Sequence, residues 1–284
     1  MPSNSTIHDT LIVGAGFTGL GAAIKLRQAG VDDIVLVGRA DRVGGTWRDN
    51  VYPGVACDIP SLLYSFSFVK NPSWSRAYPS GGEICAHIES MVDEFGLRPH
   101  IRFNTEVTGL SFDESAGVWT VTTKGRKKFQ ARTVILAGGP LADHKLPDIR
   151  GIDTYEGHTI HSAAWDDDYD FTGKRVAVIG TGASAVQIVP ELVKTAQFVK
   201  VFQRTPGWVL PRLDVQMPEA VQSLFAAVPA TQELARQALY WGHEASATAL
   251  VWKSPLSSLV ARLGRAHLRR QVKDPWLRRQ LTPD

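Results

Sequence analysis

The sequence has only two cysteines, Cys57 and Cys85, and neither belongs to a Cys-x-x-Cys pair. Two cysteines cannot build a disulfide framework, which indicates a reducing compartment and argues against a dithiol flavin reductase. The first six residues lack the basic and apolar regions of a secretory signal, and no apolar run approaches the roughly 20 residues that span a bilayer. We therefore expect a cytoplasmic protein with no membrane span.

A strong net charge is also lacking. The formal net charge is +3, which is too small to indicate a nucleic-acid partner, and the hydrophobic content of 44% is that of a soluble globular protein. Basic residues do gather near the C-terminus. We expect them to form a solvated helix face rather than a phosphate or membrane surface: Arg262, Arg265, Arg269, Arg270, Lys273, Arg278 and Arg279.

The first part of the chain has the pattern of a nucleotide-binding β-α-β unit. Apolar runs at residues 10–13 and 34–37 predict buried parallel strands, and the spacing between them predicts a helix that ends near Gly30. Glycines between a strand and a helix allow a tight turn, the approach of a pyrophosphate, and close helix–strand packing. We expect a dinucleotide at this first glycine turn, which consists of Gly14, Ala15, Gly16, Phe17, Thr18 and Gly19.

An acidic residue is missing from this unit. An acid at the end of the second strand, about 20 residues beyond the turn, usually accepts hydrogen bonds from the adenosine ribose. Gly38 occupies that place here, and Asp41 lies past the strand end. We therefore expect weaker cofactor binding than the glycine turn alone indicates.

Residues 44–58 predict a flavin-binding segment. Gly44 and Gly45, followed by Thr46 and Trp47, allow the backbone to lie flat against a planar ligand. A Tyr-Pro-Gly turn at residues 52–54 then returns Asp58 toward the same place. Residues 60–78, which include several aromatic side chains, are predicted to form a loop.

The middle of the chain alternates helix and strand signals. A capping box at residues 80–83 opens a helix with an apolar face, on which we expect His87 to be a packing residue. Strands follow at residues 106–112 and 118–123, with a third short one at 129–131 and a buried one at 133–137. A break after Pro140 marks the boundary between two nucleotide-binding units.

A second glycine turn repeats the first arrangement. A strand at residues 174–179 precedes it, and a helix and a strand at 198–202 follow it. Arg204 comes just after this last strand, where the 2′-phosphate of NADP would project, and no acid is present to favour NAD. The second glycine turn consists of Gly180, Thr181, Gly182, Ala183, Ser184 and Ala185.

Residues beyond Pro211 predict helices. Pro218, Pro255 and Pro275 sit like first-turn prolines, the last two behind the N-cap candidates Ser254 and Asp274. The apolar residues of this segment read as the core of a helical cap or as the lining of a substrate pocket: Leu239, Tyr240, Trp241, Leu250, Val251 and Trp252.

Two long motifs resemble those of the Baeyer–Villiger monooxygenases. Residues 155–166, between the two glycine turns, are similar to that family's fingerprint Phe-x-Gly-x-x-x-His-x-x-x-Trp-(Pro or Asp), with Tyr155 in place of Phe. Residues 44–58 are similar to its second signature. Trp165 and Asp166 favour this family over flavoprotein monooxygenases that oxidise sulfur or nitrogen, which remain an alternative.

The resemblance implies an FAD-containing, NADPH-dependent monooxygenase that inserts one oxygen of O2 next to the carbonyl of a small-molecule ketone. The implied fold is α/β with two Rossmann-like dinucleotide-binding units (the FAD/NAD(P)-binding fold) and a C-terminal helical segment. The implied domains are an FAD domain at residues 1–140, an NADPH domain at 141–211 and a helical cap at 212–284. Asp58 would tune a catalytic arginine, and His161 would affect domain motion. The remaining implied contacts are Thr46, Trp47, Asp58, Tyr64 and the Val107 backbone for FAD, and Gly180, Gly182, Ser184, Arg204 and Thr205 for NADPH.

The sequence also departs from the family pattern. Gly38 replaces the acid, Gly138 stands where Thr is usual, and the region that would supply the catalytic arginine is expected after residue 284. We therefore expect both units to be incomplete, apolar sheet edges to be uncovered, and the chain to be weakly active or inactive. The remaining alternative is a catalytically silent fragment, either a disrupted gene product or one half of a split enzyme that a separate C-terminal polypeptide completes.

Overall fold

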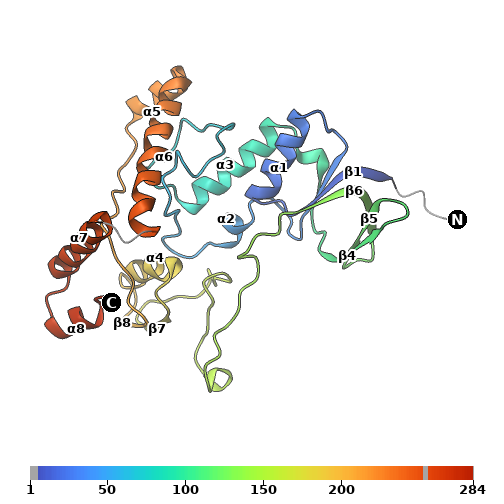
Figure 1. The fold of residues 1–284 in the computed structure, drawn as a ribbon. Helices are drawn as coiled ribbons and strands as arrows, with labels where there is room; N and C mark the ends of the chain where they lie inside the picture. The colour runs from blue at the N-terminus through green and yellow to red at the C-terminus, as the bar shows by residue number, and fades with distance from the viewer. Residues whose placement is uncertain (1–5, 252–254, 284) are drawn as a thin grey trace. The chain divides into compact units, whose positions relative to one another are not determined.

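The computed structural model describes residues 6–251 and 255–283 (Figure 1). The chain divides into two compact units. The first unit comprises residues 6–51 and Gly81–Asp167, and the second comprises Tyr52–Ser80 and residues 168–283. Each unit contains one of the two glycine turns. The domain boundaries after residues 140 and 211 stay predictions, because the compact units group the chain by its contacts and not by function.

A six-stranded sheet forms the centre of the first unit, in the order β3-β2-β1-β6-β5-β4. Strands β3, β2, β1 and β6 run parallel, and β6, β5 and β4 pair antiparallel. This mixed α/β arrangement confirms the predicted fold class. The strands are β1 (Ile7–Val13), β2 (Ile34–Val37), β3 (Ile101–Arg102), β4 (Val107–Asp113), β5 (Val118–Thr123) and β6 (Lys128–Leu136).

Helices of the first unit bury their apolar faces as the sequence predicts. Helix α1 (Phe17–Gln28) packs against β1 and β2, and Figure 1 shows it beside β1. Helix α3 (Gly81–Glu94) begins directly after Ser80. His87 is buried on α3 beside Ile84, Ile88, Met91 and Val92, which confirms its packing role. The remaining elements are the short helix α2 (Thr46–Asp49) and two 3-10 turns, Arg98–His100 and Ile152–Thr154.

Strand β6 corrects one prediction. The sequence indicated separate strands at residues 129–131 and 133–137, but the structure has one continuous strand. Its pairing with β5 ends at Ala131, so the later residues pair only with β1. Leu136 is consequently 68% exposed rather than buried, although the apolar run reads as a buried strand.

The second unit holds a two-stranded parallel sheet and most of the helices. Strands β7 (Arg175–Ile179) and β8 (Phe198–Phe202) flank helix α4 (Ala183–Leu192) in sequence. Four helices follow: α5 (Glu219–Ala227), α6 (Pro229–Val251), α7 (Pro255–Gln271) and α8 (Pro275–Gln280). Pro255 and Pro275 are first helical residues as predicted, Pro218 is an N-cap instead, and Ser254 lies outside the described residues. Asp274 does cap α8, because its carboxylate accepts the Leu277 N–H at 2.7 Å.

Helix α6 anchors the loop at residues 60–78. The buried Gln232 side chain donates to Asn71 O at 2.7 Å, and Arg236 donates to Leu62 O. Of the two readings of Leu239, Tyr240 and Trp241, the helical-cap core is wrong, because they are 37%, 43% and 66% exposed. The lining of a substrate pocket stays a prediction. The side chains of Leu250, Val251 and Trp252 lie outside what the structure describes. An apolar helical run therefore does not by itself mark a core here.

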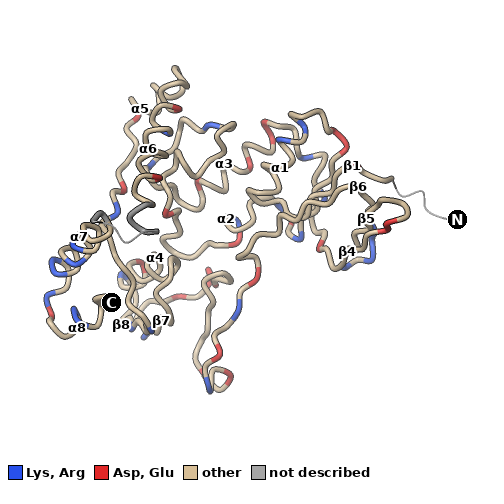
Figure 2. The backbone as a smooth tube through the Cα atoms, viewed as in Figure 1, with Lys and Arg blue, Asp and Glu red and all other residues tan. Residues whose placement is uncertain are grey.

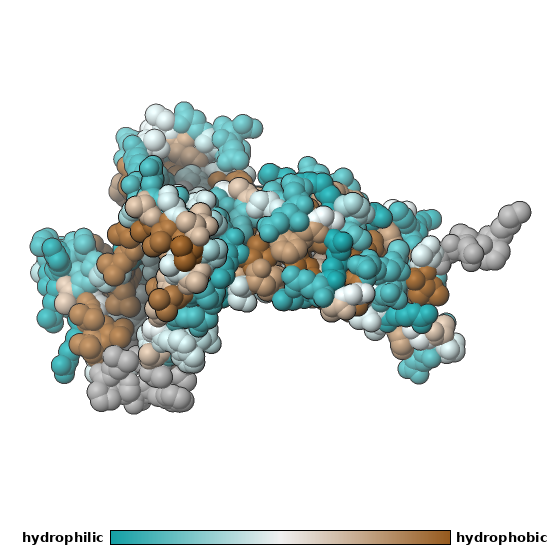
Figure 3. Space-filling view, turned by 90° about the horizontal axis from the view of Figure 1, so that it is seen from above, coloured by the Kyte–Doolittle hydropathy of each residue, from teal (hydrophilic) through white to brown (hydrophobic). Residues whose placement is uncertain are grey.

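The surface shows the predicted uncovered strands and basic helices. Ile179 is 62% exposed and Phe202 is 48% exposed, and apolar residues reach the surface in Figure 3. Lys and Arg gather on α7 and α8 in Figure 2 and are mostly exposed, whereas the choice of a solvated face over a phosphate or membrane surface stays a prediction. Among the described residues, none of the helices combines the length and the apolarity of a bilayer-spanning segment.

Candidate functional site

The first glycine turn joins β1 to α1 with the expected local geometry. Gly14 has φ +118°, and its N–H donates to Val37 O at 2.8 Å, which ties the turn to the end of β2. Gly16 is the N-cap of α1, and no side chain caps the helix there. The first N–H groups of α1 are therefore available to an anion.

Close backbone contacts explain two of the glycines. A methyl group on Gly14 would lie 2.2 Å from Ala137 O, and one on Gly19 would lie 1.9 Å from Gly14 O. Both distances are far inside van der Waals contact, so each position requires glycine. The predicted roles of the first and third glycine, a tight turn and close helix–strand packing, are confirmed.

The double glycine at residues 44–45 lies directly on this turn. Gly44 N–H donates to Ala15 O at 3.2 Å, and a methyl group on Gly45 would lie 3.1 Å from the Cα of Gly16. Gly44 and Gly45 both have positive φ. The backbone then forms the short helix α2, with Thr46 exposed and Trp47 half-buried, and does not stay extended. Two glycine segments predicted to serve one cofactor therefore meet within one unit.

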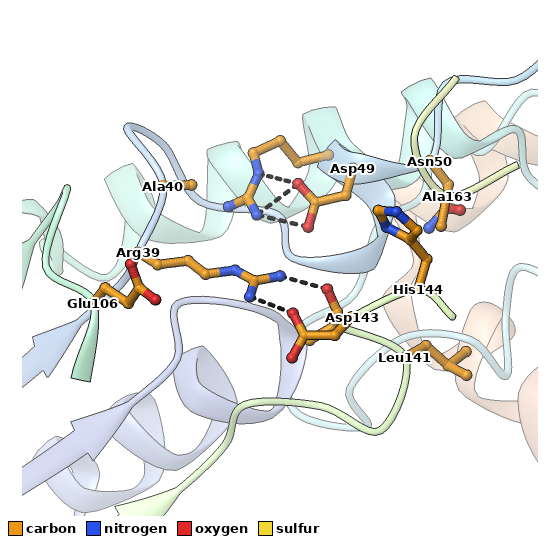
Figure 4. Close-up of a pocket in the computed structure, with 11 residues that line it drawn as sticks. Arg39, Ala40, Asp49, Asn50, Glu106, Leu141, Asp143, His144 and Ala163 are labelled. Atoms are coloured by element: carbon orange, nitrogen blue, oxygen red, sulfur yellow. Dashed lines mark hydrogen bonds and ion pairs between the residues drawn. The ribbon is translucent and has the colours of Figure 1, made fainter. Parts of the chain in front are cut away.

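A cavity of about 620 Å³ opens next to the end of β2 (Figure 4). Its walls are rich in charge. The Arg39 guanidinium donates to Asp143 Oδ1 at 2.6 Å and to Ala142 O, and Arg48 binds both carboxylate oxygens of Asp49 at 2.7 and 2.8 Å. The residues that line it are Arg39, Ala40, Arg48, Asp49, Asn50, Glu106, Leu141, Ala142, Asp143, His144 and Ala163.

Arg39 and Asp143 stabilise each other's charged form. The hydrogen bond from Arg39 lowers the pKa of Asp143, and the same bond raises the pKa of Arg39 against the opposing effect of burial. Asp143 is 84% exposed at its side chain, so this ion pair contributes little to stability. A ligand phosphate or hydroxyl could exchange with either partner at small cost.

The predicted Tyr-Pro-Gly turn is present in the second unit. Val55 N–H donates to Tyr52 O at 3.1 Å, and Gly54 has φ +79°. Gln187 of α4 holds this turn, since its side chain bonds the Tyr52 hydroxyl and the backbone of Ala56.

Asp58 follows this turn and is exposed. Its neighbour Cys57 is buried, and burial raises the pKa of the Cys57 thiol. Arg212 donates to Cys57 O at 3.1 Å and lies over the Tyr78 ring at 4.7 Å from its centroid. A basic side chain from a distant part of the chain therefore contacts the segment that carries the acid, a feature that the sequence did not indicate. Tyr64 is half-buried in the loop that follows.

The second glycine turn reproduces the first. Gly180 has φ +108°, and its N–H donates to Phe202 O at 2.8 Å, as Gly14 does to Val37 O. Gly182 is an N-cap without a side-chain cap, in the same extended conformation as Gly16. A methyl group on Gly180 or Gly182 would meet no protein atom within 4 Å, so the backbone here is open to a ligand. Thr181 and Ala183 are exposed, and Ser184 and Ala185 are half-buried in the first turn of α4.

Arg204 and Thr205 lie just past the end of β8, and both are exposed. Val107 starts β4, and its side chain packs against the core cluster around Leu11 and Val121. Its backbone, and not its side chain, is therefore the part that a ligand could contact, as the resemblance implies.

His161 lies in a compact turn. Its Nδ1 accepts the Ala163 N–H at 3.0 Å, and its ring stacks on His144 with 4.8 Å between centroids. Burial and the charge of His144 lower the pKa of His161. Nearby, His158 and Asp166 pair at 2.9 Å. Within the first unit, the fingerprint segment thus has local contacts of its own, although none of residues 155–166 is buried.

The predicted site residues divide between the two units. The glycine turn at residues 14–19, Gly45, Thr46, Trp47, Val107 and His161 belong to the first unit, and Asp58, Tyr64, Arg204, Thr205 and the second glycine turn belong to the second. Sequence reasoning missed Gln187, Arg212, Arg39 and Glu106, because their partners are far away in the chain. For Glu106, the absence of an acid at residue 38 was a usable signal.

Comparisons with known proteins identify the family of the chain. The model of the family described as pyridine nucleotide-disulphide oxidoreductase matches residues 11–227. Despite that description, both cysteines of this chain are free. A Baeyer–Villiger monooxygenase of Streptomyces coelicolor is 46% identical over the whole chain, and one of Pseudomonas aeruginosa is 41% identical over 96% of it.

Solved structures of monooxygenases are also similar to this chain. A steroid monooxygenase bound to NADP superimposes with a TM-score of 0.85 at 32% identity over 98% of the chain. The OTEMO complex with FAD and NADP does so with a TM-score of 0.82 at 29% identity over 99%.

The chain is shorter than these proteins. It spans 55% and 52% of the two curated relatives and 60% and 61% of the two solved chains. In the curated relatives the matched and unmatched parts belong to one polypeptide, so the expectation of a separate C-terminal polypeptide is not supported. The chain belongs to the pyridine nucleotide-disulphide oxidoreductase family, and its homologues include Baeyer–Villiger monooxygenases.

Proposed function

We propose that this chain binds FAD at the first glycine turn and NADPH at the second, and that it forms the nucleotide-binding part of a Baeyer–Villiger monooxygenase. The observation that carries the proposal is the repeated turn. Gly14 and Gly180 each donate an N–H to the end of the following strand at 2.8 Å, and the helix after each turn begins without a side-chain cap.

FAD is supported at the first turn by the meeting of two glycine segments. The N–H groups at the start of α1 would hold the pyrophosphate, because an uncapped helix N-terminus carries positive partial charge. Gly45 lies against Gly16 without a side chain between them, which leaves room for a ligand close to the backbone. Phe17 and Thr18 follow Gly16 in α1, and Thr46 and Trp47 follow Gly45 in α2, which makes these four residues candidates to contact the flavin nucleotide.

NADPH is supported at the second turn by its open backbone and by Arg204. Gly182 and the first residues of α4 would hold the pyrophosphate in the same way. Arg204 and Thr205 would bind the 2′-phosphate, for which a guanidinium is well suited because it donates two parallel hydrogen bonds. No acidic side chain stands at the end of β8 to favour NAD.

The reaction divides between cofactors and protein. Bound flavin supplies electron transfer from NADPH and the activation of O2. The residues of this chain bind and orient the two nucleotides. The exposed Asp58 carboxylate would position a cationic side chain near the reacting centre, and the turn of His161 would influence domain motion. The substrate proposed from the relatives is a small-molecule ketone. The cytoplasmic location stays a prediction.

Activity can be tested with a chimera. We would join this chain to the remaining 45% or so of the Streptomyces coelicolor relative, whose matched half is 46% identical. With NADPH and O2, the chimera should convert a cyclic ketone to a lactone, and the Asp58→Ala variant should lose most of this activity. The 284-residue chain alone should give little lactone.

A thioether substrate separates the alternative chemistry. A chimera that forms sulfoxide from a thioether but no lactone from several ketones would contradict Baeyer–Villiger activity and favour a monooxygenase that oxidises sulfur or nitrogen. If the chain bound neither FAD nor NADPH, the proposal as a whole would be contradicted.

A further inference from the structure

The first nucleotide unit lacks an acid at the end of β2, yet a carboxylate from elsewhere in the chain reaches the same cavity. Gly38 has no side chain, and a methyl group there would lie 3.3 Å from Ala15 Cβ, next to the glycine turn. Glu106 lines the cavity that opens at this strand end, together with Arg39 and Ala40. Figure 4 shows the Glu106 carboxylate beside the aliphatic part of the Arg39 side chain.

Backbone hydrogen bonds explain why Glu106 arrives there. Gly38 N–H donates to Arg102 O at 3.0 Å, and Thr105 N–H donates to Gly38 O at 2.7 Å, so residues 102–105 run alongside Gly38. Asn104 has φ +51° and donates its N–H to Ala40 O at 2.9 Å, which places the next residues past the end of β2. Glu106 is the first acidic residue after this contact.

The other two acids of the cavity already have strong partners. Asp49 accepts two hydrogen bonds from Arg48, and Asp143 accepts one from Arg39 at 2.6 Å. Glu106 pairs with Lys124 at 3.2 Å, and the Lys124 side chain is 77% exposed. Exposed pairs of this kind contribute little free energy, so the Glu106 carboxylate can exchange Lys124 for a ligand hydroxyl at small cost.

We propose that Glu106 replaces the missing acid of β2 and accepts hydrogen bonds from the adenosine ribose hydroxyls of FAD. The inference rests on the proposed FAD site and names a binding residue within it. Ribose hydroxyls donate well to a carboxylate, and such charge-assisted bonds are stronger than those between neutral groups. Asp143 raises the pKa of Arg39 most, and Glu106 adds a smaller effect in the same direction, which reflects how near Glu106 lies to this guanidinium.

The test compares the FAD affinity of the full chain with that of the Glu106→Ala variant, measured by flavin fluorescence. Loss of one charge-assisted hydrogen bond should lower the affinity for FAD roughly tenfold. The matched control is Glu114→Ala, an exposed glutamate on the turn between β4 and β5, which should bind FAD as the unchanged chain does. Equal affinities of the two variants would overturn the inference, and the absence of FAD binding by the unchanged chain would overturn the proposed FAD site as well.

Two further experiments separate hydrogen bonding from structural damage. ADP and 2′,3′-dideoxy-ADP are each used to displace FAD. The Glu106→Ala substitution should lower the affinity for ADP but not the affinity for the dideoxy compound, which lacks both ribose hydroxyls. Gly38→Glu should restore most of the lost affinity in the Glu106→Ala background, because it returns the acid to the strand end. An equal loss for both nucleotides, or no rescue by Gly38→Glu, would show that Glu106 does not contact the ribose.

Discussion

The side-chain amide of Gln187 pairs with the backbone of Ala56 in both directions. Nε2 donates to Ala56 O at 2.9 Å, and Oε1 accepts the Ala56 N–H at 3.1 Å. The same Oε1 accepts the Tyr52 hydroxyl at 3.2 Å. A methyl group on Gly54 would lie 2.8 Å from Gln187 O, so the turn at residues 52–56 sits tightly on α4. The segment that leads to Asp58 is therefore fastened to the helix of the second glycine turn.

Replacement of Gln187 by leucine should destabilise the second unit. The substitution keeps the approximate shape but leaves the Ala56 N–H and C=O without their partners, which costs roughly 1–3 kcal/mol for half-buried groups. Urea unfolding would measure the loss. Gln197→Leu, at an exposed glutamine before β8, is the control and should change stability far less. An equal effect of the two substitutions would mean that the hydrogen bonds of Gln187 do not stabilise the turn.

Gly182→Ala tests nucleotide binding without disturbing the protein. The added methyl group would meet no protein atom within 4 Å, and Gly182 already has a φ of -72° that alanine adopts easily. Circular dichroism and thermal stability should therefore match those of the unchanged chain, while NADP+ binding should weaken roughly tenfold or more because the pyrophosphate approaches this atom. Gly242→Ala, in α6, serves as the control. Unchanged NADP+ affinity would place the nucleotide elsewhere.

Arg204→Ala should reduce the preference for NADP+ over NAD+. The guanidinium would contact only the 2′-phosphate, so the affinity for NADP+ should fall roughly tenfold and that for NAD+ should stay the same. Calorimetric titration with both nucleotides measures the two affinities. Arg175→Ala, an exposed arginine at the start of β7, should alter neither. A parallel loss for both nucleotides would contradict recognition of the 2′-phosphate.

His87 should make the first unit sensitive to acid. Burial lowers its pKa, so below the usual histidine pKa of about 6.5 the unfolded chain binds a proton that the folded chain does not. Stability should therefore be full above this pH and should fall as the pH drops from about 6.5 through the folded-state pKa. His87→Leu should flatten the dependence of Tm on pH between about 7 and 5, unlike His243→Leu at an exposed position. If Tm depended on pH with the same slope in both variants, His87 would not be the cause of the acid sensitivity.

The sequence predicts the first glycine turn well because its determinants are local. Strand, glycines and helix follow one another, and Gly19 must be glycine because of Gly14, only five residues earlier. The prediction fails where burial depends on distant neighbours. Trp241 is 66% exposed and Leu136 is 68% exposed, although both lie in apolar runs.

The sequence also does not predict contacts between residues that are far apart in the chain. Gln187 meets a segment 131 residues earlier in the chain. Glu106 is recognised as a candidate ligand residue only from the structure, in which residues 102–105 run alongside Gly38 and Glu106 lines the cavity. Nothing in its local sequence marks it. The expectation of weak cofactor binding rests on residue 38 alone, whereas Glu106 reaches the same cavity from the connection between β3 and β4.

Titration of the purified 284-residue chain with FAD, followed by the fluorescence of the flavin, tests the central claim most directly. The two meeting glycine segments predict saturable binding of one FAD per chain. A fluorescence signal that shows no saturable binding of FAD would contradict the account.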